Sequence, residues 1–299
     1  MQYWIIQTLN SLALGGLLFL LAAGFSLIFG LMRIANLTHG SLYMLGAYAG
    51  ATLLAPRPQS LKVFQYFPQV PSIWIAALLG GAFLAVLGGL LERFILRKLA
   101  GNALGQVLVT LGISFIVADF CLIVWGGDPI SIPTPEALRS PLQVAGLSFP
   151  AYRLVVVVIA VVTAAVLYVM MERTRLGAMI RAGVDDMQMA RAVGIPVSRL
   201  FTTVFCIGAA LAGAGGVIGG PIMSAYPGLD ADMLPLALIV VILGGIGSLL
   251  GAFVGSFLIG AIYTFGTALL PDLAYVILFL PMIVVIAFRP RGLFGRKTA

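Results

Sequence analysis

Long apolar runs without a charged side chain, separated by short polar or glycine- and proline-rich segments, are the dominant pattern of the sequence. No charge occurs between Met1 and Arg33, between Gln65 and Glu92, or from Leu154 to Met171. Only Asp272 interrupts the run from Leu234 to Phe288. A hydrocarbon layer about 30 Å thick needs roughly 20 apolar residues in a helix, so these runs predict membrane-spanning helices.

The pattern predicts nine spans, within a range of about eight to ten. They cover residues 5–31, 36–55, 73–91, 104–125, 153–171, 200–220, 234–250, 252–270 and 273–288. We therefore predict an all-α, polytopic membrane helix bundle that forms a single transmembrane domain over residues 1–299. The composition is 61% hydrophobic and only 9% charged. Because soluble domains average about 25% charged residues, an ordinary soluble domain is excluded.

The basic residues predict the orientation of the bundle. Alternating spans place most of the seventeen lysines and arginines on one side: Arg33, Arg93, Arg97, Lys98, Arg173, Arg175, Arg181, Arg191, Arg199, Arg289, Arg291, Arg296 and Lys297. The other side holds Arg57, Lys62, Arg139 and Arg153. By the positive-inside rule the larger group faces the cytoplasm, which predicts an outside N-terminus and a cytoplasmic C-terminus. The net charge of +7 then reflects topology and not a nucleic-acid-binding surface.

The connections between the spans differ in character. Residues 126–152 are rich in proline, which predicts an irregular outer loop, and residues 221–233 form a second outer loop with a Pro-Gly pair. The inner segment 172–199 is polar yet nearly free of helix breakers, and its polar residues recur at helical intervals. It predicts one or two short helices at the inner surface, which serve either as a docking surface or as a solvated connection.

Small residues, most of them glycine, recur at intervals of four residues. They include Gly208, Ala212, Gly216 and Gly220 in one span and Gly247, Gly251 and Gly255 in another. Small residues at this spacing let helices pack closely within a bilayer. The run from Gly244 to Gly247 has a second interpretation, because it is too rich in glycine for a helix interior and predicts a break of the kind that transporters use near a binding site.

The residue inventory argues against an enzyme. The chain has a single histidine, His39, and its two cysteines, Cys121 and Cys206, fall in different spans, so neither a catalytic constellation nor a metal site can be assembled. Only Asp119 lies well inside a predicted span. Since ion-coupled carriers need ionisable groups within the membrane, this scarcity indicates that the energy for any transport comes from elsewhere.

Two groups of polar residues could line a path through the membrane. Asn36, His39 and Tyr43 would share one helix face near the inner end of the second span; alternatively, Asn36 caps the helix and His39 bonds locally. Thr110, Ser114 and Asp119 lie on one span, although Asp119 is near enough to its outer end to reach solvent or a basic partner. The candidate path is completed by the predicted break at Gly244, Gly245 and Gly247.

Several motifs resemble a known family. The run NLTHGSLYMLGAY over residues 36–48, preceded by GFSLIFG over residues 24–30, is similar to the opening of branched-chain amino acid ABC transporter permeases. Further matches are RTRLG at 173–177, GGIGS at 244–248 and the tail RPRGLFG at 289–295. Together they cover nearly the whole chain in order, and they resemble the shorter of that system's two permease types.

The resemblance implies a role for the inner loop. Importer permeases of this class carry Glu-Ala-Ala, three residues and then Gly on a short helix that docks on the ATPase. Here Ala190 and Gly194 match that motif, whereas Gln188 and Met189 depart from it. The implied ATPase-coupling surface consists of Arg173, Arg175, Arg181, Asp185, Asp186, Gln188, Ala190 and Gly194.

The resemblance also implies a function and partners. The chain is expected to be a multi-pass inner-membrane permease of a bacterial ABC importer, moving branched-chain or other small apolar amino acids by alternating access. The implied partners are a second related permease chain, two ATP-binding subunits, a periplasmic binding protein and membrane lipid, with no nucleic acid. The chain itself is expected to hold no cofactor or metal and to lack enzyme activity, in agreement with the absence of a Walker-type phosphate-binding run. Import of urea or short amides within the same family, and an ion-coupled secondary carrier, remain as alternatives.

Overall fold

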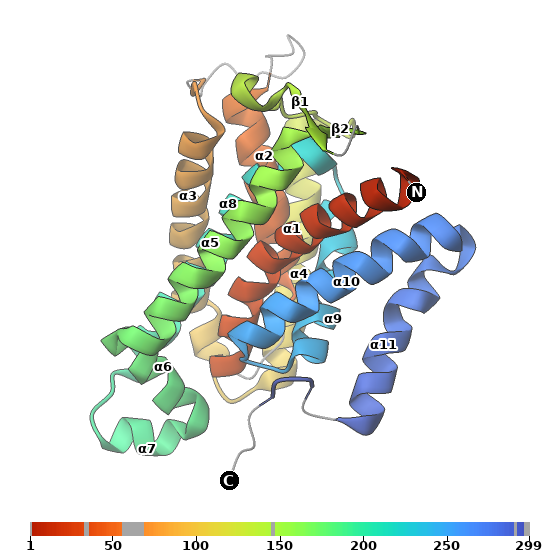
Figure 1. The fold of residues 1–299 in the computed structure, drawn as a ribbon. Helices are drawn as coiled ribbons and strands as arrows, with labels where there is room; N and C mark the ends of the chain where they lie inside the picture. The colour runs from red at the N-terminus through yellow and green to blue at the C-terminus, as the bar shows by residue number, and fades with distance from the viewer. Residues whose placement is uncertain (1, 33–35, 56–68, 145–146, 290–291, 296–299) are drawn as a thin grey trace. The chain divides into compact units, whose positions relative to one another are not determined.

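The structure is a computed structural model that describes residues 2–32, 36–55, 69–144, 147–289 and 292–295. Six basic residues used in the topology prediction lie outside the described residues: Arg33, Arg57, Lys62, Arg291, Arg296 and Lys297. The chain, whose helices and strands are drawn in Figure 1, divides into two compact units. The first contains Met1–Arg33, Glu136–Phe201 and Pro235–Ala299, and the second contains Ile34–Pro135 and Thr202–Leu234.

The first unit is built around the long helix α1, Gln2–Met32. It packs against α5, Ala151–Arg173, and α10, Leu249–Leu269. Glycines allow the close approach, because a β-carbon on Gly15 would lie 2.8 Å from the Phe257 ring on α10. The unit also contains α6 (Arg175–Asp185), α7 (Met187–Ala192), most of α9 (Leu229–Gly244), the short η4 (Pro271–Leu273) and α11 (Ala274–Phe288).

The second unit contains α2, Thr38–Leu54; α3, Ile73–Phe94; and α4, Ala103–Trp125. A short 3-10 helix, η2 (Leu96–Leu99), joins α3 to α4, and most of α8 (Val197–Met223) completes the unit. Glycines again set the packing distances. A β-carbon on Gly46 of α2 would lie 2.2 Å from the carbonyl oxygen of Gly213 on α8. One on Gly88 of α3 would lie 2.5 Å from the β-carbon of Ala209 on α8.

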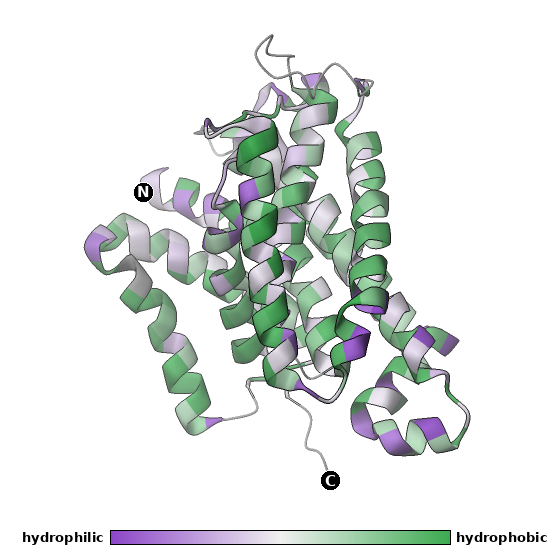
Figure 2. Cartoon of the chain, turned by 180° about the vertical axis from the view of Figure 1, so that it is seen from behind, coloured by the Kyte–Doolittle hydropathy of each residue, from purple (hydrophilic) through white to green (hydrophobic). Residues whose placement is uncertain are grey.

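The helices confirm the all-α membrane prediction. Each of the nine predicted spans corresponds to a helix among the described residues, namely α1, α2, α3, α4, α5, α8, α9, α10 and α11. Six of them, α1, α3 (with η2), α4, α5, α8 and α10, are long and apolar enough to cross a membrane unaided. The other three are shorter, at 17, 16 and 15 residues for α2, α9 and α11. Figure 2 shows apolar residues along the long helices and polar residues gathered on α6 and α7.

Both outer-loop predictions need correction. Residues 126–152 are not wholly irregular, because β1 (Pro141–Val144) and β2 (Leu147–Pro150) form an antiparallel hairpin in which Pro141 pairs with Pro150, after a short η3 at Glu136–Leu138. The predicted loop 221–233 shrinks to residues 224–228, since α8 continues through Pro221 to Met223 and α9 begins at Leu229. Proline is tolerated inside membrane helices because neighbouring groups satisfy the freed backbone.

The predicted glycine break is confirmed. Helix α9 ends at Gly244 and α10 begins at Leu249, so the predicted spans 234–250 and 252–270 overran the break. Between them Gly245 and Gly247 have φ values of 100° and 75°, a conformation that favours glycine. The tail closes the end of α9, since the backbone N–H groups of Leu293 and Phe294 donate to the Leu243 and Gly244 carbonyls at 2.8 and 3.0 Å.

The contact of α2 with α8 leads to a stability prediction. Replacing Gly46 with alanine places a methyl group against the Gly213 carbonyl and should destabilise the protein by about 1–3 kcal/mol. Gly112 on α4 has no atom within 4 Å of a built β-carbon, so Gly112→Ala is the matched control and should be neutral or slightly stabilising. The loss of folded protein after heating in detergent, followed by size-exclusion chromatography, measures both. Equal melting of the two variants would contradict the packing argument.

Candidate functional site

The start of helix α2 lies beside the middle part of helix α4. At its start the Leu37 N–H donates to Thr110 Oγ1 at 3.3 Å and the Thr38 hydroxyl donates to the Thr110 carbonyl at 2.9 Å. Thr110 lies seven residues, or about 10 Å, along α4 from Ala103. Two helices are thus tied together at a depth where irregular backbone needs partners within the protein.

The three residues predicted on α2 are all buried. Asn36 precedes the helix and is 2% exposed, and His39 and Tyr43 lie on its first two turns. The capping alternative is wrong, because among the described residues no side chain caps α2 and neither polar atom of the Asn36 amide has a hydrogen-bond partner. The Asn36 backbone carbonyl instead accepts from the His39 N–H at 3.1 Å. Within the same part of the chain the Tyr43 hydroxyl is also buried without a partner.

The three residues predicted on α4 do not form one polar face. Thr110 is buried against α2. Ser114 is half-buried and donates to the carbonyl of Leu111 on its own helix at 2.7 Å. Asp119 is exposed, and at 100° per residue it lies opposite Thr110 on the helix. Among the described residues Asp119 makes no ion pair, which fits the alternative that it reaches solvent better than pairing with a basic residue.

A carboxylate that the sequence reasoning missed joins the start of α2. Asp230 lies on the first turn of α9 and is 9% exposed. Its Oδ2 accepts from the buried Ser41 hydroxyl at 3.0 Å. A β-carbon on Gly40 would lie 2.9 Å from the Asp230 carbonyl oxygen, so only glycine permits this approach. The sequence assigned Asp230 to an outer loop, and the interpretation failed because α9 begins at Leu229.

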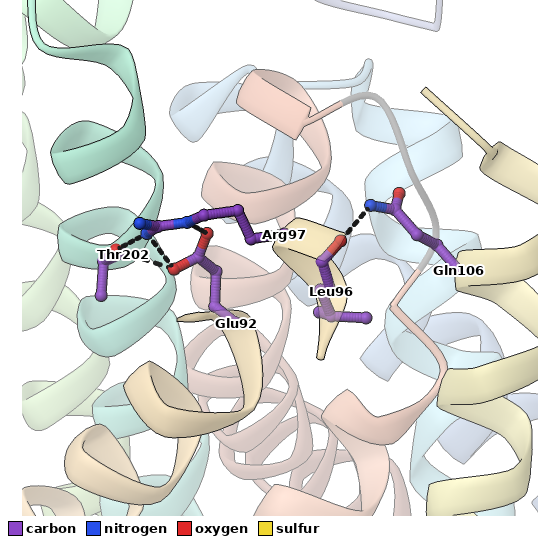
Figure 3. Close-up of polar contacts among 5 residues, drawn as sticks. All are labelled: Glu92, Leu96, Arg97, Gln106 and Thr202. Carbon is purple, nitrogen blue, oxygen red and sulfur yellow. Dashed lines mark hydrogen bonds and ion pairs between the residues drawn. The ribbon is translucent and has the colours of Figure 1, made fainter. Parts of the chain in front are cut away.

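A second buried carboxylate, Glu92 at the end of α3, was also missed. Its two oxygens accept from Arg97 Nε at 3.1 Å and Arg97 Nη2 at 2.7 Å, and the Thr202 hydroxyl of α8 donates to Oε2 at 2.7 Å. Arg97 also contacts Thr202 directly. Figure 3 shows these three side chains pointing toward one another, with the Gln106 amide donating to the nearby Leu96 carbonyl at 2.8 Å. This cluster holds α3, η2, α4 and α8 together at one end of the second unit.

The inner segment forms the two predicted short helices. Asp186 caps α7 by accepting from the N–H groups of Gln188 and Met189 at 2.8 and 2.9 Å. Gly194 ends the turn after α7 with a φ of 87°. Arg181 pairs with Glu172 at 3.6 Å. Most of the predicted coupling residues are exposed, namely Arg173, Arg175, Asp185, Asp186, Gln188 and Gly194, whereas Arg181 is half-buried.

The two positions that match the family motif have structural roles. Ala190 is buried, with 2% exposure, and Gly194 supplies the left-handed turn. Met189 of α7 and Val193, which directly follows α7, are 61% and 69% exposed. Two apolar side chains one helical turn apart are therefore open to solvent among exposed charged residues.

The predicted break at Gly244, Gly245 and Gly247 belongs to the first unit. A β-carbon on Gly30 of α1 would lie 2.6 Å from the α-carbon of Gly247. A β-carbon on Gly292 would lie 2.6 Å from the α-carbon of Gly245. The tail motif and the glycine motif therefore form one packed structure around the end of α9.

A sequence profile that matches most of the chain shows its family. The sequence profile described as "Branched-chain amino acid transport system / permease component" matches residues 7–286. The high-affinity branched-chain amino acid transport system permease protein BraD of Pseudomonas aeruginosa is 28% identical, covering 98% of this chain and 96% of BraD. The corresponding protein LivH of Escherichia coli K12 is 26% identical over the same shares. Among solved structures, PsaBC from Streptococcus pneumoniae in complex with Fab covers 93% of this chain and 89% of that chain, at 15% identity and a TM-score of 0.48.

The Glu92 cluster leads to a second prediction. Glu92→Met removes the carboxylate that pairs with Arg97 and should destabilise the protein by about 1–3 kcal/mol, because the Arg97 side chain is 33% exposed and keeps part of its hydration. The double variant Glu92→Met/Arg97→Met should recover most of that loss. Glu136→Met is the control, because Glu136 forms an exposed pair with Arg139 and should matter little. Thermal unfolding in detergent gives the ranking. A double variant less stable than the single one would contradict the role of Glu92.

Proposed function

The chain belongs to the permease-component family of branched-chain amino acid transport systems, and from this membership we propose that it forms the membrane path of an ATP-driven importer of branched-chain amino acids. It is an ABC transporter permease component and a multi-pass protein of the inner membrane. The family match over residues 7–286 carries the proposal. The names of BraD and LivH, each aligned over nearly the whole length, support the same substrate class.

In this proposal, partner chains supply the free energy for transport. Two ATP-binding subunits hydrolyse ATP, and this chain holds no cofactor and catalyses no reaction. Helix α7 and the residues around it dock on one of these subunits, since α7 presents Met189 and Val193 beside exposed charges. The Asp186 cap and the Gly194 turn stabilise the two ends of α7. The helix then stays folded when the ATP-binding subunit displaces it.

Movement of α7 reaches the bundle along α8. The segment from α7 to α8 is short, and the N–H groups of Arg199 and Leu200 donate to the Pro196 carbonyl at 2.9 and 3.0 Å, so α8 begins directly after it. A second, related permease chain completes the path, and a periplasmic binding protein delivers the amino acid. Alternating access then follows from the displacement of helices that are packed through glycines and respond as rigid bodies.

A reconstituted system tests this function. Proteoliposomes that contain this chain, its partner permease and both ATP-binding subunits should take up leucine, isoleucine and valine when ATP and the binding protein are supplied. Uptake should stop when ATP is replaced by ADP. Urea, acetamide and fructose serve as alternative substrates. Uptake that the chain supports alone, driven by a proton gradient without ATP, would contradict the proposal and favour a secondary carrier.

The docking surface gives a prediction of its own. Val193→Glu places a charge on the exposed apolar face of α7 and should reduce uptake and co-purification of the ATP-binding subunits at least tenfold, because a central apolar contact is worth about 1–2 kcal/mol or more. Val193→Leu is the control at the same position and should retain both. The amount of each variant in the membrane is compared by immunoblot. Normal co-purification of the Val193→Glu variant would place the docking surface elsewhere.

A further inference from the structure

The second unit buries two carboxylates, Glu92 and Asp230, and they differ in their hydrogen-bonding and charged partners. Glu92 has Arg97 and Thr202 as partners, as described above. Asp230 accepts from the neutral Ser41 hydroxyl, and among the described residues no basic side chain forms an ion pair with it. An ionised carboxylate buried without a cation is costly in any protein, and inside a membrane such a residue marks a functional site.

A buried hydroxyl without a partner lies on the same helix as Ser41. Ser41 and Tyr48 are seven residues apart and therefore share one face of α2. Side chains on a helix lean toward its N-terminus, so Tyr48 leans along that face in the direction of Ser41. Tyr48 is fully buried, and among the described residues its hydroxyl has no hydrogen-bond partner.

The start of α2 offers hydrogen-bond donors and a partial positive charge, which suit an anionic group as Asp230 suits a cationic one. Asn36 is 2% exposed, and among the described residues its amide has no partner, which leaves two N–H donors immediately before the helix. The N-terminus of a helix carries a partial positive charge that favours a carboxylate. This amide therefore stands at the start of the helix that carries Ser41, the hydrogen-bond partner of Asp230.

We propose that this cluster, formed by Asp230, Ser41, Tyr48 and Asn36, binds a zwitterionic amino acid during its passage. Asp230 receives the ammonium group, and the Tyr48 hydroxyl oxygen accepts a further N–H. Asn36 and the first turn of α2 hold the carboxylate. Ser41 positions Asp230 by donating to Oδ2, which leaves Oδ1 for the ligand.

The inference rests on the proposed function and narrows its substrate class. A cationic centre is what satisfies Asp230, and urea, short amides and sugars carry none. The cluster therefore selects ligands with an α-ammonium group. The choice among amino acids with different apolar side chains depends on the rest of the path and on the binding protein.

Asp230→Asn tests the inference in proteoliposomes that contain the complete complex. Leucine uptake and ATP hydrolysis stimulated by leucine-loaded binding protein are measured together. Asparagine has the same shape and can still bond Ser41, so the complex should assemble and hydrolyse ATP within twofold of the wild type. Uptake should fall at least about 30-fold, the effect of losing a buried charged partner. Ser41→Ala should give a smaller loss through a higher KM for uptake.

Asp232→Asn is the matched control. Asp232 lies two residues further on the same turn of α9, is exposed, and accepts from the Tyr226 hydroxyl at 2.6 Å. This variant should keep both uptake and hydrolysis. Uptake by Asp230→Asn within threefold of the wild type would overturn the inference. Failure of Asp230→Asn to assemble would also overturn it, because Asp230 would then have a structural role.

The outcome also separates this inference from the proposed function. A wild-type complex that imports urea, acetamide or fructose but no amino acid contradicts the proposed function itself. A wild-type complex that imports leucine while Asp230→Asn does so equally well contradicts only the role of Asp230.

Discussion

A polar group that a membrane-spanning helix buries has to find its partner inside the protein, because the hydrocarbon layer offers no water. The second unit meets this constraint at several points where its helices start or stop. Thr110 forms hydrogen bonds with the first residues of α2, the Gln106 amide donates to the Leu96 carbonyl of η2, and the Glu92 carboxylate accepts from Arg97 and Thr202. The few buried groups that lack a partner are informative for the same reason, since a membrane protein has no solvent to satisfy them when no ligand is bound.

Close packing through glycine makes this arrangement possible. At Gly46, Gly88 and Gly30 the neighbouring backbone or side chain leaves no room for a side chain at the contact, and small residues are what allow helices to approach this closely in a membrane. Where the backbone has to leave the helix, glycine serves differently: Gly245, Gly247 and Gly194 adopt positive φ values in turns. The same residue type thus explains both the rigid pairs and the breaks between them.

The sequence predicted what depends on length and local chemistry. Runs of about 20 apolar residues suffice to place helices, and all nine predicted spans correspond to helices. The glycine run at Gly244 and the polar segment 172–199 also behaved as their local patterns indicate. The errors lie where local signals compete. Pro221 indicates the end of a helix but lies within α8, and the proline-rich loop folds into a hairpin that has Pro141 and Pro150 at its open end, where the strand pairing stops.

The candidate site could be predicted only in part. Asn36, His39 and Tyr43 stood out because polar residues are rare in an apolar run, and the structure buries all three. Asp230 and Glu92 could not be recognised, because their partners Ser41 and Thr202 are 189 and 110 residues away in sequence. From the sequence alone, a carboxylate at the edge of an apolar run is assigned to a loop. Only the fold shows which groups contact it.

The motifs that carried the family resemblance also gain a physical meaning in the structure. The run that begins at Asn36 forms the start of α2, where glycine at position 40 lets α9 approach and Ser41 holds Asp230. The glycine motif and the tail motif, far apart in sequence, meet where Leu293 and Phe294 close the end of α9. One motif therefore lies against the N-terminal turn of α9 and the other two close its C-terminal end. The motifs that carried the resemblance thus contact both ends of α9, a helix of 16 residues, and each end is fixed by residues that are distant in sequence.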